Sequence, residues 1–154
     1  MSNKLVENMW KALAKSPYVM IGLNKNAEHS EPMRAQLDEE ANGYFWFYTT
    51  KDNRIAEGGK AMAQFASKDH EMFACIAGHL VEETDQDVIS RYWSNPVEAW
   101  YEGGREDPSL KMMRFELDTA EIWSVDPSVV GMIKLSSGAT LSSNEMGEHN
   151  KIAF

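Results

Sequence analysis

The sequence contains a single cysteine, Cys75, and far fewer basic than acidic residues. One cysteine excludes an intramolecular disulfide and any zinc site built from several cysteines, and it is typical of proteins of the reducing cytoplasm. Because the chain has 15 Lys and Arg residues and 24 Asp and Glu residues, the formal net charge is −9. A surface with this charge repels nucleic-acid phosphates and anionic lipids. We therefore expect a cytoplasmic protein whose partners include neither nucleic acid nor membrane.

Long apolar runs and the common catalytic motifs are also missing. No apolar stretch approaches the roughly 18 residues that cross a bilayer. The sequence has no Gly-x-Gly-x-x-Gly, no P-loop and no Gly-x-Ser-x-Gly, so it gives no support to Rossmann, P-loop or serine-hydrolase chemistry. His70 and His79 flank Cys75 at a spacing that matches no standard metal site. The prediction is that no metal is bound, and the catalytic residues stay unknown.

Helical patterns are few. Leu5, Met9 and Leu13, spaced four apart, predict one amphipathic helix over residues 4–15 that ends at Ser16-Pro17. Three shorter helices are expected over residues 52–58, over 84–93, where Thr84 and Asp87 resemble a capping box, and over 96–103, behind Pro96.

Most remaining apolar segments have the length and alternation of strands. Strands are expected over residues 18–23, 33–37, 44–48, 60–67 and 71–81, followed by a hairpin of 112–117 and 120–125 that turns at Asp118-Thr119. Strands without regular helices between them predict a small antiparallel barrel of the α+β class, mainly β. We expect one domain over residues 1–126 and a Gly/Ser-rich C-terminal extension over 127–154, packed on the surface or partly ordered.

The segment from Phe47 to Arg54 is the strongest candidate for a ligand site. An aromatic strand ends in the hydroxyl groups of Thr49 and Thr50, and the cations Lys51 and Arg54 follow at the start of the expected short helix. Helix N-terminal N–H groups, hydroxyl donors and a guanidinium fork are what a phosphate group requires. The alternative is a polar turn that only caps the helix. Likewise, the aromatic run 44–48 either fills the core or contacts a flat ligand or a second chain.

Several motifs, in order, resemble the pyridoxamine 5′-phosphate oxidase-like FMN-binding split barrels, in the branch of the bacterial general stress proteins. The resemblance covers residues 4–126. It rests on Pro32-Met33-x-Ala35-Gln36, Trp46-Phe47-Tyr48-Thr49, Asn53-Arg54, Ala66-Ser67-Lys68-Asp69-His70, Ala99-Trp100-Tyr101-Glu102-Gly103-Gly104 and Ala120-Glu121-Ile122-Trp123. It implies a six-stranded antiparallel split β-barrel with flanking short helices, and a homodimer with two FMN sites at the subunit interface.

The resemblance also implies binding roles for individual residues. Met33, Arg34, Ala35 and Gln36 would lie along the flavin and its ribityl chain, Tyr48 and Thr49 would contact the ribityl–phosphate portion, and Asn53 and Arg54 would hold the phosphate. Trp123 would approach the flavin from the other subunit. Thr50 and Lys51 complete the predicted set of cofactor-binding residues.

The sequence departs from the family pattern in ways that bear on function. Glu31 stands where many relatives have Arg, and it places an acid near the expected phosphate. Ile55 replaces a second phosphate cation, so either Lys51 substitutes for it or the phosphate is held less tightly. The oxidase's C-terminal Arg-Leu-His-Asp-Arg stretch has no counterpart after Trp123. Oxidation of pyridoxamine phosphate is therefore not expected.

These observations predict an FMN-binding redox protein of the general stress type. It is a candidate FMN-dependent oxidoreductase, in which the flavin would carry the electrons and a nicotinamide could be the reductant. Two alternatives stay open: a non-catalytic flavin store or sensor with a degenerate site, and a structural dimer whose site is empty.

Overall fold

A computed structural model describes residues 3–38, 43–125, 134–140 and 147–154. Within them, seven strands form one antiparallel sheet in the order β2-β1-β4-β5-β6-β3, and β7 also pairs with β6. The strands are β1 (Tyr18–Leu23), β2 (Glu31–Arg34), β3 (Tyr44–Thr50), β4 (Gly59–Ala66), β5 (Met72–Glu83), β6 (Leu110–Ser124) and β7 (Glu148–Ala153). The helical segments include α1 (Asn3–Lys15), α2 (Gln86–Arg91), α3 (Asn95–Glu98) and the 3-10 turn η1 (Gly104–Glu106). The predicted class, α+β and mainly β with short helices, is confirmed.

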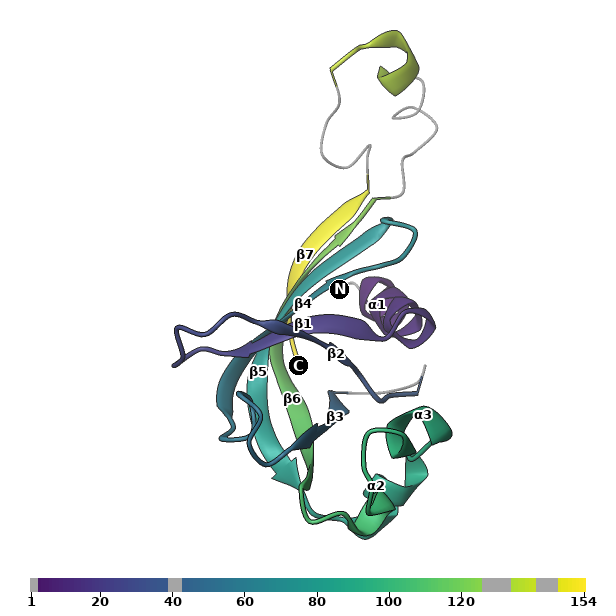
Figure 1. Ribbon diagram of the computed structural model, residues 1–154. Coiled ribbons are helices and arrows are strands. Elements are labelled where there is room, and N and C mark those ends of the chain that lie inside the picture. Colours follow the sequence, from purple (N-terminus) through teal and green to yellow (C-terminus); the bar gives the residue numbers. More distant parts are fainter. Residues whose placement is uncertain (1–2, 39–42, 126–133, 141–146) are drawn as a thin grey trace.

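The sheet curls so that its edge strands β2 and β3 approach each other (Figure 1). Just after β2, the backbone groups of Gln36 and Trp46 exchange hydrogen bonds of 2.7 and 3.1 Å and form an isolated bridge. β2 itself pairs with β1 over residues 31–34, so this strand begins and ends earlier than the predicted 33–37. The edges thus meet at this bridge without a continuous ladder, as in a barrel that is split.

Helix α1 packs on the concave side of the sheet and completes the core. Its Leu5, Met9 and Leu13 are at most 1% exposed, and Trp10 packs edge-on against Phe45 with ring centroids 6.3 Å apart. Burying each large apolar side chain contributes about 1.5–3 kcal/mol. Packing of this face therefore stabilises the helix more than helix propensity does. The helix predicted from the four-residue spacing is confirmed.

Strand β6 is continuous where a hairpin was predicted, and that prediction is wrong. On β5, Ala77 pairs with Thr119 and the next residue, Gly78, pairs with Leu117, so Asp118 is an extra residue in β6. Such a β-bulge bends the strand without reversing it. A Cβ at Gly78 would lie 2.2 Å from the carbonyl oxygen of Glu116. The polar pair Asp118-Thr119 therefore marks a bulge, and Gly78 allows the close approach of the two backbones.

The segment after β3 contains turns where a short helix was predicted over residues 52–58. Three successive hydrogen bonds span three residues each: Asn53 N to Thr50 O, Ala56 N to Asn53 O, and Gly58 N to Ile55 O. The Asn53 side chain also accepts a hydrogen bond from Ile55 N at 2.9 Å. This Asx turn satisfies the backbone locally and competes with helix formation. The predicted contribution of a helix N-terminus to phosphate binding is therefore removed.

Helices α2 and α3 form a small lobe below the end of β3 (Figure 1). The side chain of Asp85 caps α2 by accepting a hydrogen bond from Asp87 N at 2.9 Å, so Asp85 takes the capping role predicted for Thr84. α3 carries Pro96 in its first turn, as predicted, but it ends at Glu98 and a separate 3-10 turn follows. The single helix expected over 96–103 is thus two shorter elements.

The end of the predicted C-terminal extension, residues 148–153, joins the sheet. β7 pairs with residues 119–124 of β6, and Phe154 packs edge-on against Trp10 at 6.3 Å. With the predicted hairpin merged into β6, the addition of β7 gives seven strands, one more than the six-stranded barrel that the resemblance implies. The predicted domain boundary at residue 126 lies outside the described residues and stays a prediction. In the described part of the chain, no helix has the length and apolar character needed to span a membrane.

Candidate functional site

A cleft of about 640 Å³ lies between β2, the end of β3 and the α3 lobe. We call it the β2–β3 cleft. Its lining residues are Tyr18, Glu31, Pro32, Met33, Arg34, Gln36, Tyr48, Thr49, Thr50, Asn53, Ser94, Pro96, Val97, Trp100 and Tyr101. Most of the residues predicted to bind the cofactor are in this set, although they come from two strands and a turn that are separate in sequence. The fold therefore brings Met33, Arg34, Gln36, Tyr48, Thr49, Thr50 and Asn53 together.

Two tyrosines fix the aromatic wall of the cleft. Tyr48 donates its hydroxyl hydrogen bond to Ile89 O at 2.5 Å, and Tyr101 donates to Thr49 O at 2.9 Å. Burial raises the pKa of Tyr101 to about 12, and burial, followed by the neighbouring Tyr92 and Tyr101, raises the pKa of Tyr48 further. Both phenols are therefore neutral at physiological pH, with their protons committed to backbone carbonyls. They shape the wall rather than serve as an acid or base.

The α3 lobe supplies an apolar rim that the sequence did not assign to the site. Pro96, Val97 and Trp100 line the cleft, and Trp100 is 84% exposed. Large exposed aromatic side chains at a concave site are typical contacts for flat organic ligands. The available signal was the motif that contains Trp100 and Tyr101, which belonged to the family resemblance but carried no role.

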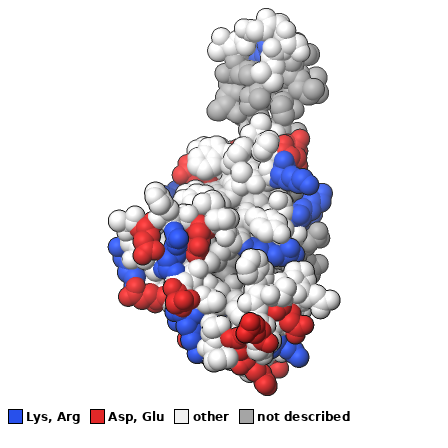
Figure 2. Space-filling view, in the orientation of Figure 1, with Lys and Arg blue, Asp and Glu red and all other residues white. Residues whose placement is uncertain are grey.

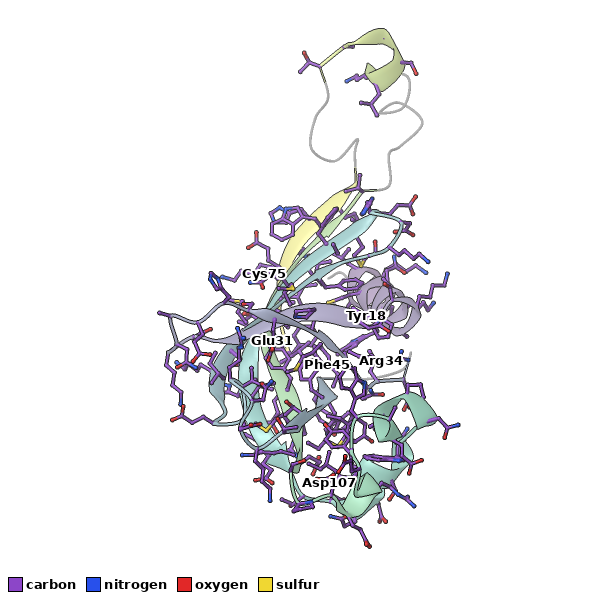
Figure 3. The ribbon with its side chains drawn as sticks, viewed as in Figure 1. Tyr18, Glu31, Arg34, Phe45, Cys75 and Asp107 are labelled. Atoms are coloured by element: carbon purple, nitrogen blue, oxygen red, sulfur yellow. The ribbon has the colours of Figure 1, made fainter. Side chains whose placement is uncertain are left out.

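Among the described residues that line the cleft, Arg34 is the one with a positively charged side chain. Its guanidinium donates to the Tyr18 hydroxyl at 3.2 Å and lies 5.7 Å from the centre of that ring. Figure 3 shows Tyr18 and Arg34 beside each other, with Glu31 further along β2. Acidic side chains gather at the end of the molecule that carries α2 and α3, whereas the centre of the same face is largely uncharged (Figure 2). An anionic group would therefore meet its favourable local charge at Arg34.

The residues predicted to hold a phosphate have other partners. Asn53 Nδ2 donates to Glu31 Oε1 at 2.7 Å. The Arg54 guanidinium donates to His29 O at 2.7 Å, and its Nε lies 3.7 Å from a Glu31 oxygen and 3.8 Å from a Glu28 oxygen. Arg54 thus faces the segment that leads into β2 and does not line the cleft. Glu31 occupies the position between the predicted phosphate ligands.

The structure places three further predicted residues away from the cleft lining. Ala35 is 2% exposed and its side chain belongs to the core. Lys51 is exposed in the turn after β3. Trp123 lies near the C-terminal end of β6, whereas the end of β3 that lines the cleft pairs with the N-terminal end of β6. Trp123 is 38% exposed, and its ring stacks on His149 with a centroid distance of 4.9 Å. Among the residues that the structure describes, no three His, Cys, Asp or Glu side chains group as potential metal ligands.

Comparison with known proteins identifies the family of the chain. The family model described as pyridoxamine 5′-phosphate oxidase like matches residues 4–144. The chain belongs to this family. A general stress family protein from Xanthomonas campestris pv. campestris is 40% identical, with a TM-score of 0.75, over 84% of this chain and 92% of its own. A general stress FMN/FAD binding protein from Xanthomonas citri is also 40% identical, with a TM-score of 0.74, over 83% of this chain and 94% of its own.

A third structure extends the likeness of the fold along the chain. General stress protein 26 from Jannaschia sp. CCS1 has a TM-score of 0.82 at 24% identity and covers 98% of both chains. A search of curated proteins found no match. The predicted general stress branch of the pyridoxamine 5′-phosphate oxidase-like family and its split-barrel fold are confirmed.

Proposed function

We propose that this general stress protein binds FMN in the β2–β3 cleft. The observation that carries the proposal is the convergence of Met33, Gln36 and Thr49 on one cleft with an aromatic wall and an exposed tryptophan at its rim. A volume of about 640 Å³ is in the range of small-molecule sites. The Xanthomonas citri relative, described as an FMN/FAD binding protein, supports a flavin as the ligand.

The cleft residues fit the parts of such a molecule. Met33, Pro32 and Trp100 offer apolar and aromatic surface for a flat ring system, while Arg34 and Gln36 offer polar groups beside it. Ala35 would contribute only through its backbone, because its side chain is in the core. The hydroxyl of Thr49 and the amide of Asn53 would lie toward the phosphate. The Thr50 hydroxyl, which also lines the cleft, donates to Asp52 Oδ1 at 2.6 Å, and the cations Lys51 and Arg54 lie outside the lining. Bound FMN would supply electron-transfer chemistry.

A second copy of the chain is the proposed partner. The convex side of the sheet exposes Tyr18, Met20, Phe73 and Trp123, which we call the outer face. A groove of about 410 Å³ crosses this face and shares Tyr18 and Pro32 with the cleft. Exposed apolar patches of this kind typically bury against another protein. Because the groove borders the cleft at Tyr18 and Pro32, a homodimer formed through the outer face would place the second copy, including its Trp123, beside the cleft.

Oxidoreductase activity, a nicotinamide reductant and a cytoplasmic location stay predictions from the sequence. One observation favours the non-catalytic alternative, a flavin store or sensor. The hydroxyls of both cleft tyrosines are bound to backbone carbonyls, so neither is placed to exchange a proton with a substrate.

The test is the spectrum and ligand content of the purified protein. We expect flavin absorbance, and release of FMN on denaturation that mass spectrometry identifies. Trp100→Ala should weaken flavin binding by about three- to tenfold, the scale of an aromatic contact, whereas Tyr44→Ala, an exposed aromatic that does not line the cleft, should not. A colourless protein that binds neither added FMN nor riboflavin would refute the proposal. Reduction of bound flavin by NADPH then separates a redox enzyme from a store.

A further inference from the structure

Glu31 begins β2 and lines the cleft, with 24% of its side chain exposed. One carboxylate oxygen accepts the 2.7 Å hydrogen bond from Asn53, and the other lies 3.7 Å from Arg54 Nε. Both residues predicted to hold a phosphate therefore face a single carboxylate of the same chain.

The charge around Arg54 is already balanced. Glu31 and Glu28 both lie within 3.8 Å of its Nε, so two carboxylates surround one guanidinium. A phosphate that approached Asn53 would meet the Glu31 carboxylate as a like charge, and it would have to replace an existing hydrogen bond. A carboxylate and a phosphate present oxygen acceptors of similar kind to amide and guanidinium donors, so they compete for the same groups.

We propose that Glu31 is a specificity-determining residue of the β2–β3 cleft. Its carboxylate competes with the terminal phosphate of the ligand for Asn53 and Arg54. As a result, the cleft gains little affinity from that phosphate and binds the phosphorylated and unphosphorylated forms of one flavin with similar affinity. This inference rests on the proposed flavin-binding function.

A purely structural role for Glu31 makes a different prediction. If Glu31 only ties β2 to the turn after β3, then removing its charge affects both ligand forms equally. Glu31→Gln separates the two roles, because the amide oxygen of Gln can still accept the hydrogen bond from Asn53 while the negative charge is lost. Glu57→Gln is the matched control: Glu57 pairs with Lys25 at 3.3 Å, is 71% exposed and does not line the cleft.

The experiment compares FMN with riboflavin. Each ligand is titrated into the full-length apoprotein, the Glu31→Gln variant and the Glu57→Gln control, and binding is followed by flavin fluorescence. In the wild type and the control, the two dissociation constants should agree within about threefold. Glu31→Gln should raise the preference for FMN by roughly tenfold or more, the scale of a charge-assisted hydrogen bond. An unchanged preference, or a wild type that already prefers FMN by about a hundredfold, overturns the inference.

Inorganic phosphate keeps this test separate from the flavin proposal. At equal ionic strength, replacing chloride with phosphate should raise the melting temperature of Glu31→Gln more than that of the wild type or Glu57→Gln. If no flavin binds but this difference is found, the proposed function fails and the role of Glu31 stands. If flavin binds but phosphate acts alike on all three proteins, and the FMN preference is unchanged, only the role of Glu31 fails.

Discussion

The indole nitrogen of Trp46 donates a hydrogen bond of 2.9 Å to Oε1 of Glu83. The same oxygen accepts a hydrogen bond from the Arg114 guanidinium, also at 2.9 Å. Trp46, Glu83 and Arg114 lie on β3, β5 and β6, and Glu83 is only 9% exposed. This cluster therefore joins three strands beside α2 and holds β3, which supplies Tyr48 and Thr49 to the cleft.

The Glu83 cluster predicts how stability depends on pH. Burial opposes ionisation, but the hydrogen bonds from Trp46 and Arg114 outweigh it and hold the pKa of Glu83 below its ordinary value of 4.5. A carboxyl with a lowered folded-state pKa stabilises the fold above its unfolded pKa, and this contribution is lost as pH falls through the folded value. Glu83→Gln should lower the free energy of unfolding near neutral pH by about 1–3 kcal/mol, and urea titrations should show this difference shrinking below about pH 4.

Glu116→Gln is the control for that experiment, because Glu116 contacts the same arginine at 3.0 Å but is 46% exposed. Loss of this exposed pair should cost at most about 1 kcal/mol. Equal losses in the two variants would show that burial of the Glu83 pair has no special effect.

Gly78 predicts a severe effect from one added methyl group. In Gly78→Ala the new Cβ would lie 2.2 Å from the backbone oxygen of Glu116, which cannot move without opening the ladder at the bulge. We expect a loss of about 3 kcal/mol or more in the free energy of unfolding. Gly22→Ala is the comparison, because the atom nearest to its new Cβ would be the rotatable hydroxyl of Ser30 at 2.7 Å. This substitution should lower the free energy of unfolding by about 1 kcal/mol. Thermal unfolding of both variants checks the difference, and similar melting temperatures would contradict it.

Tyr101 predicts a loss of stability in alkali. Burial raises its pKa from 10.0 to about 12, so between these values the unfolded chain releases a proton that the folded chain keeps. The free energy of unfolding therefore falls as pH rises through this interval. Tyr101→Phe should be less stable than wild type by about 0.5–1.5 kcal/mol near pH 8, with the gap closing near pH 11. Guanidinium titrations at both pH values measure this, and exposed Tyr44→Phe should leave the pH dependence as in wild type.

The local elements were predictable where a pattern had one physical meaning. The four-residue spacing of Leu5, Met9 and Leu13 has no reading other than an amphipathic helix, and α1 is confirmed. Asp118-Thr119 had two meanings, since polar residues interrupt a strand both at a turn and at a bulge. The two are distinguished by the pairing partner Gly78, which has no side chain and so allows the β6 backbone to approach closely. The local sequence does not show which residues pair across strands.

The site was predictable for similar reasons, and only in part. The family resemblance assigned Gln36 and Thr49 to one site, and both line the cleft. Their roles in binding stay predictions. The position of Arg54 was not predictable, because its partners His29 and Glu28 lie far away in sequence and the expected helix does not form. The α3 rim, with Trp100, was missed because an exposed aromatic in the turn after a short helix has no periodicity to reveal its surroundings.

The outer face predicts how the chain assembles. Phe73 is 37% exposed beside the groove and pairs with Trp123 across β5 and β6. Phe73→Arg would place a charge in the proposed apolar interface, so sedimentation velocity should change from dimer to monomer. Because Phe73 is already partly exposed, the melting of the monomer itself should change little. Tyr44→Arg, an aromatic replacement outside the outer face, should remain dimeric. A wild-type protein that is monomeric with flavin bound would contradict the interface.

The coupling between Glu31 and Arg54 tests whether Glu31 reduces the contribution of Arg54 to binding of the FMN phosphate. As a free phosphate ligand, Arg54 would contribute about 1.5–3 kcal/mol to FMN binding. Because Glu31 lies 3.7 Å from its Nε, we expect Arg54→Ala to weaken FMN binding by less than about threefold in the wild type, but by about tenfold or more in the Glu31→Gln background. Riboflavin, which has no phosphate, should show no such coupling. Equal losses in both backgrounds would mean that Arg54 binds the phosphate regardless of Glu31, and the balanced charge seen around the guanidinium would then have no bearing on affinity.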